Sequence, residues 1–407
     1  MIDVRSTIEK VNGFKVAGVH AGLKPDGALD FALFVSDRPC LAAAVFTTNE
    51  VKSAHVLEGM DKLQRNSRSI RAVAINTKCA NACTGQQGID NARQMARWVA
   101  ERIGCGEDEV LVMSTGVIGT QLPMDKIRRG IDLAADALGD DWEAAARAIM
   151  TTDTRPKQAS VISESGYQVA GVVKGSGMIA PNMATMLSLI VTDAGFSDVR
   201  PVQTALQTVA ASTYNCIVVD GDMSTNDTVL LLANGASGVM LDGAREQVDF
   251  HHALELTSTQ LAQDVVRDGE GVTKFITLHV LGAESDAAAR TIANTIATSP
   301  LVKTAFHGGD ANWGRIIAAA GRSGIALQPE KMRLHISTGV PEGDDDRGLL
   351  LFESGIPTHY SEARAGEIMS APEITIVLDC GQGEGAATVW TCDLSHDYVS
   401  INGHYRT

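Results

Sequence analysis

Residues 174–192 read KGSGMIAPNMATMLSLIVT, and the interpretation of the chain starts from this stretch. Two glycines flank Ser176, and Pro181 and Asn182 interrupt regular structure before an apolar run begins. This pattern predicts a loop that ends at the edge of a buried strand, where Thr185 can present its hydroxyl. A phosphate-binding loop is disfavoured because the GxxxxGK[ST] pattern is missing and Lys174 precedes the glycines.

The Thr185 hydroxyl is a candidate nucleophile, but it needs a base beside it. Its own α-amine has an ordinary pKa of about 7.7–8.0 and becomes available only if the preceding peptide bond is cut. The hydroxyl can make that cut by attacking the carbonyl of Ala184, which forms an ester that water hydrolyses. Spacing alone leaves this open, because a threonine at the start of a strand is usually an ordinary strand residue.

Acyl transfer also needs donors that stabilise the oxyanion. Residues 110–119, VLVMSTGVIG, predict a strand that runs into Ser114, Thr115 and Gly116, where a hydroxyl and a backbone N–H can converge. The alternative is a strand-to-loop turn whose hydroxyls satisfy local backbone groups.

A metal site is not predicted. Cys79 and Cys83 lie four residues apart, but no second Cys/His pair at zinc spacing accompanies them. Asp220, Asp222 and Asp227 do not follow EF-hand spacing, so we expect a hydrogen-bonded turn there.

Composition predicts a soluble globular protein of the cytoplasm. The 407 residues are 44% hydrophobic and carry a net charge of -15, all of it from residues 185–407, which disfavours nucleic-acid binding. The N-terminus lacks the apolar core of a secretory signal, and no apolar run reaches the ~18 residues of a membrane span. The seven cysteines are scattered and odd in number, as is typical of reduced thiols.

Periodicity predicts a mixture of helices and strands, which is typical of a mixed α/β or α+β class. Helices are expected over residues 91–103, 125–138, 142–150, 202–212, 253–266 and 287–298. Strands are expected over residues 41–46, 72–75, 110–113, 168–173, 187–191, 217–219, 228–232, 276–281 and 374–378. The acidic residues 343–347 predict an exposed loop, and a lobe boundary near residue 285 is weakly marked.

Ten short motifs, in order along the chain, resemble the ArgJ-type ornithine acetyltransferase family, also called glutamate N-acetyltransferase. They are AGLKPDG, VFTTN, NTKCANACTG, STGVIG with LPM, TTDTRPKQ, KGSGMIAPNMATML, VDGDMSTNDT, GEGVTK, HGGDANWGRI and the YRT tail. The resemblance implies a layered α/β fold like that of the ArgJ and DmpA proteins, with sheets packed between helices and a smaller C-terminal lobe, about residues 285–407.

The resemblance further implies a precursor that cleaves itself into an α chain, residues 1–184, and a β chain, residues 185–407, which assemble as an α2β2 heterotetramer. The implied reaction belongs to arginine biosynthesis. Thr185 takes acetyl from N2-acetyl-L-ornithine, releases ornithine, and passes the acetyl group to L-glutamate in a ping-pong cycle. No cofactor is implied, and the sequence leaves open whether acetyl-CoA also serves as donor.

Site residues follow by matching the family's motifs. Thr185 matches the nucleophile, and Thr115 and Gly116 match the oxyanion pair. The residues that match substrate contacts are Thr151 or Thr152, Lys174, Glu270, Asn402 and Thr407. In chemical terms, Lys174 can pair with a carboxylate and Glu270 can hold an ammonium group, while Asn402 offers both a donor and an acceptor.

Two departures from the family's pattern leave local loop geometry open. Ala311 stands where the family commonly has proline, and Thr77, Lys78 and Cys79 replace part of the usual NSGNANACTG run. A hydrolase of the related self-processing fold, with water as acceptor, is the main alternative function. Glu270 and the INGHYRT tail favour an amino-acid pocket instead.

Overall fold

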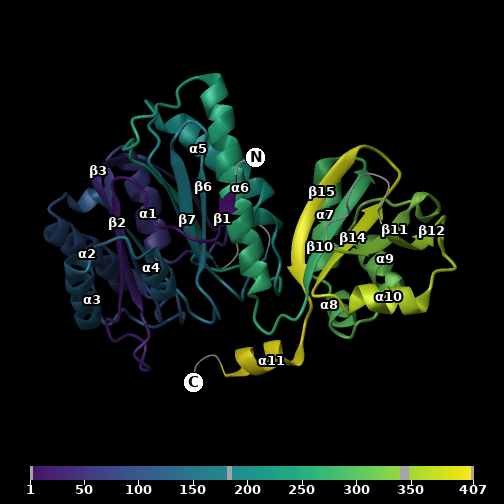
Figure 1. Ribbon diagram of the computed structural model, residues 1–407. Helices are drawn as coiled ribbons and strands as arrows, with labels where there is room; N and C mark the ends of the chain where they lie inside the picture. Colours follow the sequence, from purple (N-terminus) through teal and green to yellow (C-terminus); the bar gives the residue numbers. More distant parts are fainter. Residues whose placement is uncertain (1–2, 181–185, 340–347, 405–407) are drawn as a thin grey trace. The chain divides into compact units, whose positions relative to one another are not determined.

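The computed structural model describes residues 3–180, 186–339 and 348–404. The chain divides into two compact units (Figure 1). Unit 1 comprises Met1–Asn215 and Asp222–Val265, and unit 2 comprises Cys216–Gly221 and Val266–Thr407. Each unit combines a β-sheet with helices, so the expected mixed α/β class is confirmed.

Unit 1 contains a nine-stranded sheet in the order β1-β6-β7-β8-β9-β3-β4-β5, with β2 also paired to β3. The bounds of these strands are β1 Val4–Arg5, β2 Phe14–Val19, β3 Phe31–Phe46, β4 Ile70–Asn76, β5 Val110–Ser114, β6 Lys157–Ile162, β7 Gln168–Lys174, β8 Leu187–Thr192 and β9 Thr228–Ala233. The β8–β9 and β4–β5 pairs are parallel, and the other pairs are antiparallel.

The long strand β3 divides this sheet into two halves. Its first part pairs with β2 and β4, its register shifts between Val35 and Cys40, and residues 41–46 pair with β9. The two halves share one apolar core, to which Phe34, Ile75 and Leu189 all contribute. Such a register shift bends a strand, and here it lets one strand serve both halves.

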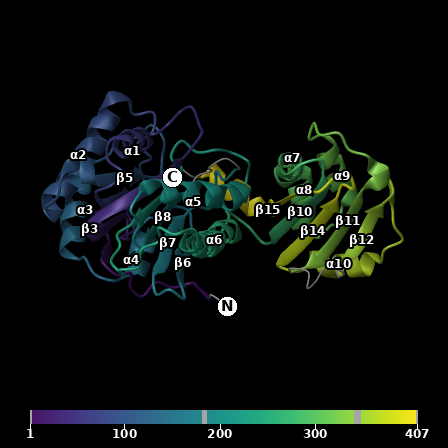
Figure 2. The ribbon, with the colours of Figure 1, turned by 90° about the horizontal axis from the view of Figure 1, so that it is seen from above.

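Helices cover the outer faces of the two halves (Figures 1 and 2), and the short helix Trp142–Ala148 contributes to the core that the halves share. The helices of unit 1 are α1 Ala54–Arg65, α2 Gly85–Ile103, α3 Met124–Asp136, α4 Trp142–Ala148, α5 Val199–Ser212 and α6 Ala244–Arg267, whose last residues enter unit 2. Helices α2 and α3 pack on the half that holds β2, β4 and β5, where they share a core with Leu33 and Val112. Helix α5 packs on β3 and β9, and Leu261 of α6 contacts β7 at Gly171. Sheets packed between helices are therefore confirmed for unit 1.

Strand β8 shows why the stretch that contains it folds as it does. All six of its residues, LSLIVT, are buried, and it lies between β7 and β9 near the middle of the sheet. A strand covered on both faces gains from an uninterrupted apolar run, because side chains on either side leave water. In the sequence, the candidate nucleophile Thr185 lies two positions before the first residue of β8.

Unit 2 contains a six-stranded sheet in the order β13-β12-β11-β14-β10-β15. Its strands are β10 Phe275–Ala283, β11 Arg333–Thr338, β12 Leu349–Glu353, β13 Ile356–Pro357, β14 Glu373–Asp379 and β15 Gly385–Cys392. Its helices are α7 Asp286–Ala297, α8 Pro300–His307, α9 Trp313–Gly321, α10 Glu362–Met369 and α11 His396–Gly403. Apolar side chains of α7, α9 and α10 form one core with β10, β11 and β14.

The strand expected over residues 217–219 is wrong. Ile217 forms only a single bridge with Trp390, directly after a 3₁₀ turn over Tyr214–Cys216. The segment is apolar because it is buried in unit 2, not because it pairs along its length. The expected loop at residues 343–347 lies outside the described residues. Every helix in the described ranges is too short or too polar to span a bilayer.

Candidate functional site

Two predicted site residues of unit 1 meet although 59 positions separate them. Thr115 follows β5 and Lys174 ends β7, and the Lys174 ammonium donates to the Thr115 hydroxyl oxygen at 3.1 Å. Both side chains are buried, at 4% and 2% exposure. Because lysine has donors only, the Thr115 oxygen must act as acceptor in this bond. The hydroxyl proton of Thr115 is then free to point toward another acceptor.

Gly116 is placed where no other residue fits. Its φ of 133° lies in the region that favours glycine, and an added Cβ would lie 2.2 Å from the carbonyl carbon of Lys78. Lys78 itself has a φ of 69°, at a position where the related motif has glycine. The backbone of residues 78–79 therefore lies directly against Gly116. Lys78 adopts the left-handed conformation although it replaces the glycine of the family's motif, which costs about 1 kcal/mol.

Buried polar groups hold Ser114, the last residue of β5, through hydrogen bonds. The Ser114 hydroxyl donates to Asn76 Oδ1 at 2.7 Å, and Asn226 Nδ2 donates to the carbonyls of Ala80 and Ser114 at 2.6 and 2.7 Å. His55 accepts the Ser114 N–H at Nδ1 and donates from Nε2 to the Asn226 carbonyl. Burial lowers the pKa of His55 to about 3, so this ring stays neutral at physiological pH.

A buried carboxylate, Asp153, fixes the other side of the Lys174 segment. Its side chain accepts from Lys157 Nζ at 2.6 Å, from the Gly175 N–H at 2.7 Å and from the Thr151 N–H at 2.8 Å. Burial alone would raise the pKa of Asp153, but the charges of Lys157 and Lys174 together with the Gly175 N–H hold it below its ordinary value. Asp153 thus stays ionised next to Lys174.

The two candidate threonines of the TTDT motif differ in their partners. Thr151 bonds Asp153 through its backbone and, at 3.5 Å, through its hydroxyl. The hydroxyl of Thr152 lies 2.7 Å from that of Ser176, in the loop that follows β7. Thr152 is therefore the one whose hydroxyl contacts the KGSG motif, and the choice between them as substrate contact stays a prediction.

The proposed cleavage site lies outside the described residues, because Ala184 and Thr185 are both among residues 181–185. The next residue, Met186, is described, and its N–H donates to Asp227 Oδ1 at 3.0 Å. Burial raises the pKa of Asp227 well above its ordinary value, although the Met186 N–H and Lys174 act in the opposite direction. A buried acid therefore holds the N–H of Met186, the first described residue after Thr185.

Two of the predicted substrate contacts, Glu270 and Asn402, lie together in unit 2. Glu270 precedes β10, and Asn402 lies near the end of α11. Asn402 Nδ2 donates to Glu270 Oε2 at 2.7 Å, and Glu270 is 8% exposed. The predicted contact Thr407 lies outside the described residues. A carboxylate with one neutral donor keeps its negative charge available to a cation.

Sequence reasoning missed Asp153 and Asp393. Asp153 lies inside the TTDT motif and four residues before Lys157, a spacing that usually indicates a helical pair. Here the pair is instead buried at the start of β6. Asp393 directly follows the apolar strand β15, and an acid at the end of a buried strand was the available signal.

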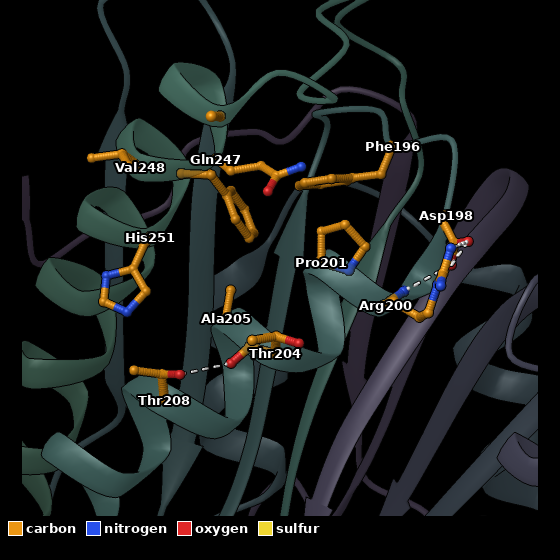
Figure 3. A pocket seen from close by; sticks show the side chains of 12 residues that line it. Phe196, Asp198, Arg200, Pro201, Thr204, Ala205, Thr208, Gln247, Val248 and His251 are labelled. Carbon is orange, nitrogen blue, oxygen red and sulfur yellow. Dashed lines mark hydrogen bonds and ion pairs between the residues drawn. The ribbon is translucent and has the colours of Figure 1, made fainter.

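An open pocket of about 570 Å³ lies elsewhere in unit 1, between α5 and α6 (Figure 3). Phe196 and Phe250 pack edge to face at 4.9 Å in its wall, and Asp198 and Arg200 at its rim pair with each other. Its lining contains none of the predicted site residues. Among the described residues, no group of three or more His, Cys, Asp or Glu side chains is arranged to hold a metal ion.

Comparison with known proteins gives the family. A family model described as the ArgJ family matches residues 15–407. The chain is 46% identical over 409 residues to the arginine biosynthesis bifunctional protein ArgJ of Geobacter sulfurreducens, covering 98% of this chain and 100% of that protein. It is 45% identical over 417 residues to the mitochondrial ArgJ protein of Podospora anserina, covering 97% and 88%. A crystal structure of the ArgJ protein from Bacillus halodurans aligns with 38% identity and a TM-score of 0.49, over 54% of this chain and 99% of that one. The match to the family model and the identity to the two relatives show that the chain belongs to the ArgJ family.

Proposed function

We propose that this ArgJ-family acyltransferase of arginine biosynthesis cuts itself between Ala184 and Thr185 and then transfers acetyl from N2-acetyl-L-ornithine to L-glutamate. The observation that carries the proposal is the bond from Lys174 to the Thr115 hydroxyl, 3.1 Å long. It directs the Thr115 proton away from Lys174 and leaves it available to a developing oxyanion. Donors fixed before the reaction stabilise such charge most effectively, because they need not reorient.

Self-cleavage begins when the Thr185 hydroxyl attacks the Ala184 carbonyl carbon. The oxyanion accepts hydrogen bonds from the Thr115 hydroxyl and the Gly116 N–H, the peptide C–N bond breaks, and the nitrogen takes the hydroxyl proton. Water then hydrolyses the resulting ester, which leaves a carboxylate on Ala184 and a free α-amine on Thr185. The new amine is the base that the second reaction needs.

Acetyl transfer repeats this chemistry on a substrate amide. The Thr185 hydroxyl attacks the acetyl carbonyl of N-acetyl-ornithine while its α-amine takes the proton and passes it to the leaving nitrogen. Ornithine leaves, and the amine of glutamate attacks the acetyl ester to give N-acetyl-glutamate and free Thr185. Lys174 pairs with the substrate α-carboxylate, whereas Glu270, with Asn402 beside it, holds the side-chain ammonium of ornithine.

The proposal includes assembly and location. The α and β chains form an α2β2 heterotetramer in the cytoplasm, without cofactor or metal. The relatives named as bifunctional ArgJ proteins support a second activity of the enzyme, and we propose that acetyl-CoA is the donor in it. Incubating the enzyme with acetyl-CoA and glutamate alone tests this activity, since N-acetyl-glutamate can then form only from acetyl-CoA.

A denaturing gel with N-terminal sequencing tests the cleavage. We expect two bands, the second beginning at Thr185, and a single uncut, inactive chain for Thr185→Ala. Normal turnover of N-acetyl-ornithine by Thr185→Ala would show that the nucleophile is wrong. Thr115→Val should lower turnover by about 10²-fold, because it removes one oxyanion donor. Acetate release without transfer to glutamate would instead favour a hydrolase.

A further inference from the structure

Glu270 lies in the loop just before β10. The contacts that fix this loop therefore also fix the direction of the Glu270 carboxylate. Residues 271–274, GVTK, connect Glu270 to β10, and they are tied to the segment that follows β15. Asp393 Oδ1 accepts the N–H groups of Thr273 and Lys274 at 2.8 and 2.9 Å. Asp393 Oδ2 accepts the Thr273 hydroxyl at 2.6 Å and also meets His307 Nδ1 at 2.8 Å.

The same segment contacts the loop at a second point. The Ser395 hydroxyl donates to the Gly271 carbonyl at 2.6 Å and accepts the Tyr398 N–H at 3.3 Å, where it caps α11. Gly271 has a φ of 69°, and an added Cβ would lie 2.5 Å from the Tyr398 nitrogen. The loop therefore lies directly against the first turn of α11, the helix that carries Asn402.

Burial makes Asp393 well suited to hold this arrangement. Its side chain is 0% exposed, and four donors reach its two oxygens. Burial alone would raise the pKa of Asp393, but the bonds from Thr273, His307 and Lys274 hold it below its ordinary value. A desolvated carboxylate with its acceptor positions filled holds its donors in fixed directions.

We propose that Asp393 is a positioning residue for substrate selection: it clamps the 271–274 loop so that the Glu270 carboxylate stays beside Asn402 and selects substrates with a cationic side chain. This inference rests on the proposed function, in which Glu270 holds the ornithine ammonium. Asp393 is saturated by the chain's own donors and acts only through Glu270. Glutamate carries no ammonium on its side chain, so the clamp serves the first half of the cycle more than the second.

The test is steady-state kinetics of Asp393→Ala, Asp393→Asn and wild type, all checked for self-cleavage and circular dichroism. For Asp393→Ala we expect the KM of N-acetyl-ornithine to rise about 10- to 100-fold, the loss of one charge-assisted contact, with a much smaller change for glutamate. Asp393→Asn still offers one oxygen, now of an amide, to the N–H groups of Thr273 and Lys274, and it should recover most of that affinity. Glu353→Gln, which breaks an exposed ion pair with Arg333, is the matched control in unit 2 and should behave as wild type.

The outcomes separate the two proposals. If wild type transfers acetyl but Asp393→Ala keeps the wild-type KM for N-acetyl-ornithine, or raises both KM values equally, the clamp is refuted and the proposed function stands. If wild type does not transfer acetyl, the proposed function fails whatever Asp393 does. Thr273→Val removes only one of the four bonds to Asp393, so it serves as the test if Asp393→Ala does not fold. We expect it to raise the KM of N-acetyl-ornithine about threefold. No rise in this KM would refute the clamp.

Discussion

Replacing Asp153 by alanine should be among the most damaging single changes in unit 1. The carboxylate is fully buried, and it accepts from Lys157 Nζ, from the Gly175 N–H and from the Thr151 N–H. Alanine removes the carboxylate that pairs with the buried Lys157 ammonium and that accepts from two N–H groups. Breaking a buried pair in this way costs about 3–5 kcal/mol. That is a large share of the 5–15 kcal/mol or so by which a domain is stable.

A double substitution shows whether the lost charge pairing is the cause. Asp153→Asn keeps most of the volume but still removes the negative charge that pairs with the Lys157 ammonium, so it should cost nearly as much as alanine. Adding Lys157→Met removes the Lys157 ammonium as well, and the methionine side chain fills the space of the lysine methylene groups. The double variant should return to within about 2 kcal/mol of wild type, because buried ion pairs gain little over apolar replacements.

Urea unfolding followed by circular dichroism measures both effects. With a slope of about 3 kcal/mol per molar urea, Asp153→Ala should lower the midpoint by about 1 M or more. Glu143→Gln is the control, since it breaks an exposed pair with Arg147 at the same four-residue spacing, and it should cost less than about 0.5 kcal/mol. A double variant as unstable as Asp153→Asn alone would refute the reasoning, as would an Asp153→Ala variant that loses less than about 1 kcal/mol.

Three further predictions concern buried groups near the site. Burial lowers the pKa of His55 to about 3, so as the pH falls the unfolded chain takes up a proton at this ring before the folded chain does. The free energy of unfolding should therefore fall by about 2 kcal/mol between pH 7 and pH 5. The urea midpoints of the wild type should differ between these two pH values, and those of His55→Gln should not. Burial raises the pKa of Asp227, so ionisation of this side chain opposes folding once the pH exceeds the ordinary pKa of an aspartate. Asp227→Asn should therefore melt at least as high as wild type at pH 8. A lower melting temperature of the variant at that pH would contradict this. Gly116→Ala should lower the free energy of unfolding by about 3 kcal/mol or more and abolish turnover, because its Cβ would overlap the backbone of Lys78. Gly119→Ala is the control, because Gly119 also has a positive φ, 83°, but no atom lies within 4 Å of the added Cβ. It should lower the free energy of unfolding by only about 1 kcal/mol in the same thermal and activity assays.

Local patterns predicted the elements whose signal is local. The run LSLIV, residues 187–191, predicted a strand, and β8 extends one residue further and is buried at all six residues. The first half of β3 was missed, because the polar residues 36–39, SDRP, interrupt FALFVSDRPCLAAAVF. In the structure this interruption is the bulge at which β3 passes from β4 to β9. Proline is tolerated at such an irregularity, so the pattern that argued against one strand in fact marked its bend.

The candidate site could be predicted in its residues but not in its contacts. Thr115 and Lys174 each belong to a motif, yet the bond between them depends on how β5 and β7 are placed in one sheet. The same holds for Glu270 and Asn402, which are 132 positions apart. The positioning residues Asp153 and Asp393 were missed because an acid in a loop usually indicates solvent exposure. Only the fold shows that these two carboxylates are buried.

Stability and chemistry are coupled at Asp153. This carboxylate pairs with Lys157, and its pKa is also lowered by the charge of Lys174. Lys174 in turn donates to Thr115, and that bond leaves the Thr115 proton free for an oxyanion. A change at Asp153 therefore disturbs the fold and the direction of a candidate catalytic hydroxyl together. Asp153→Asn/Lys157→Met should separate the two effects. It restores the fold but removes the Asp153 charge that acts on Lys174, so turnover should stay low in a protein of nearly normal stability.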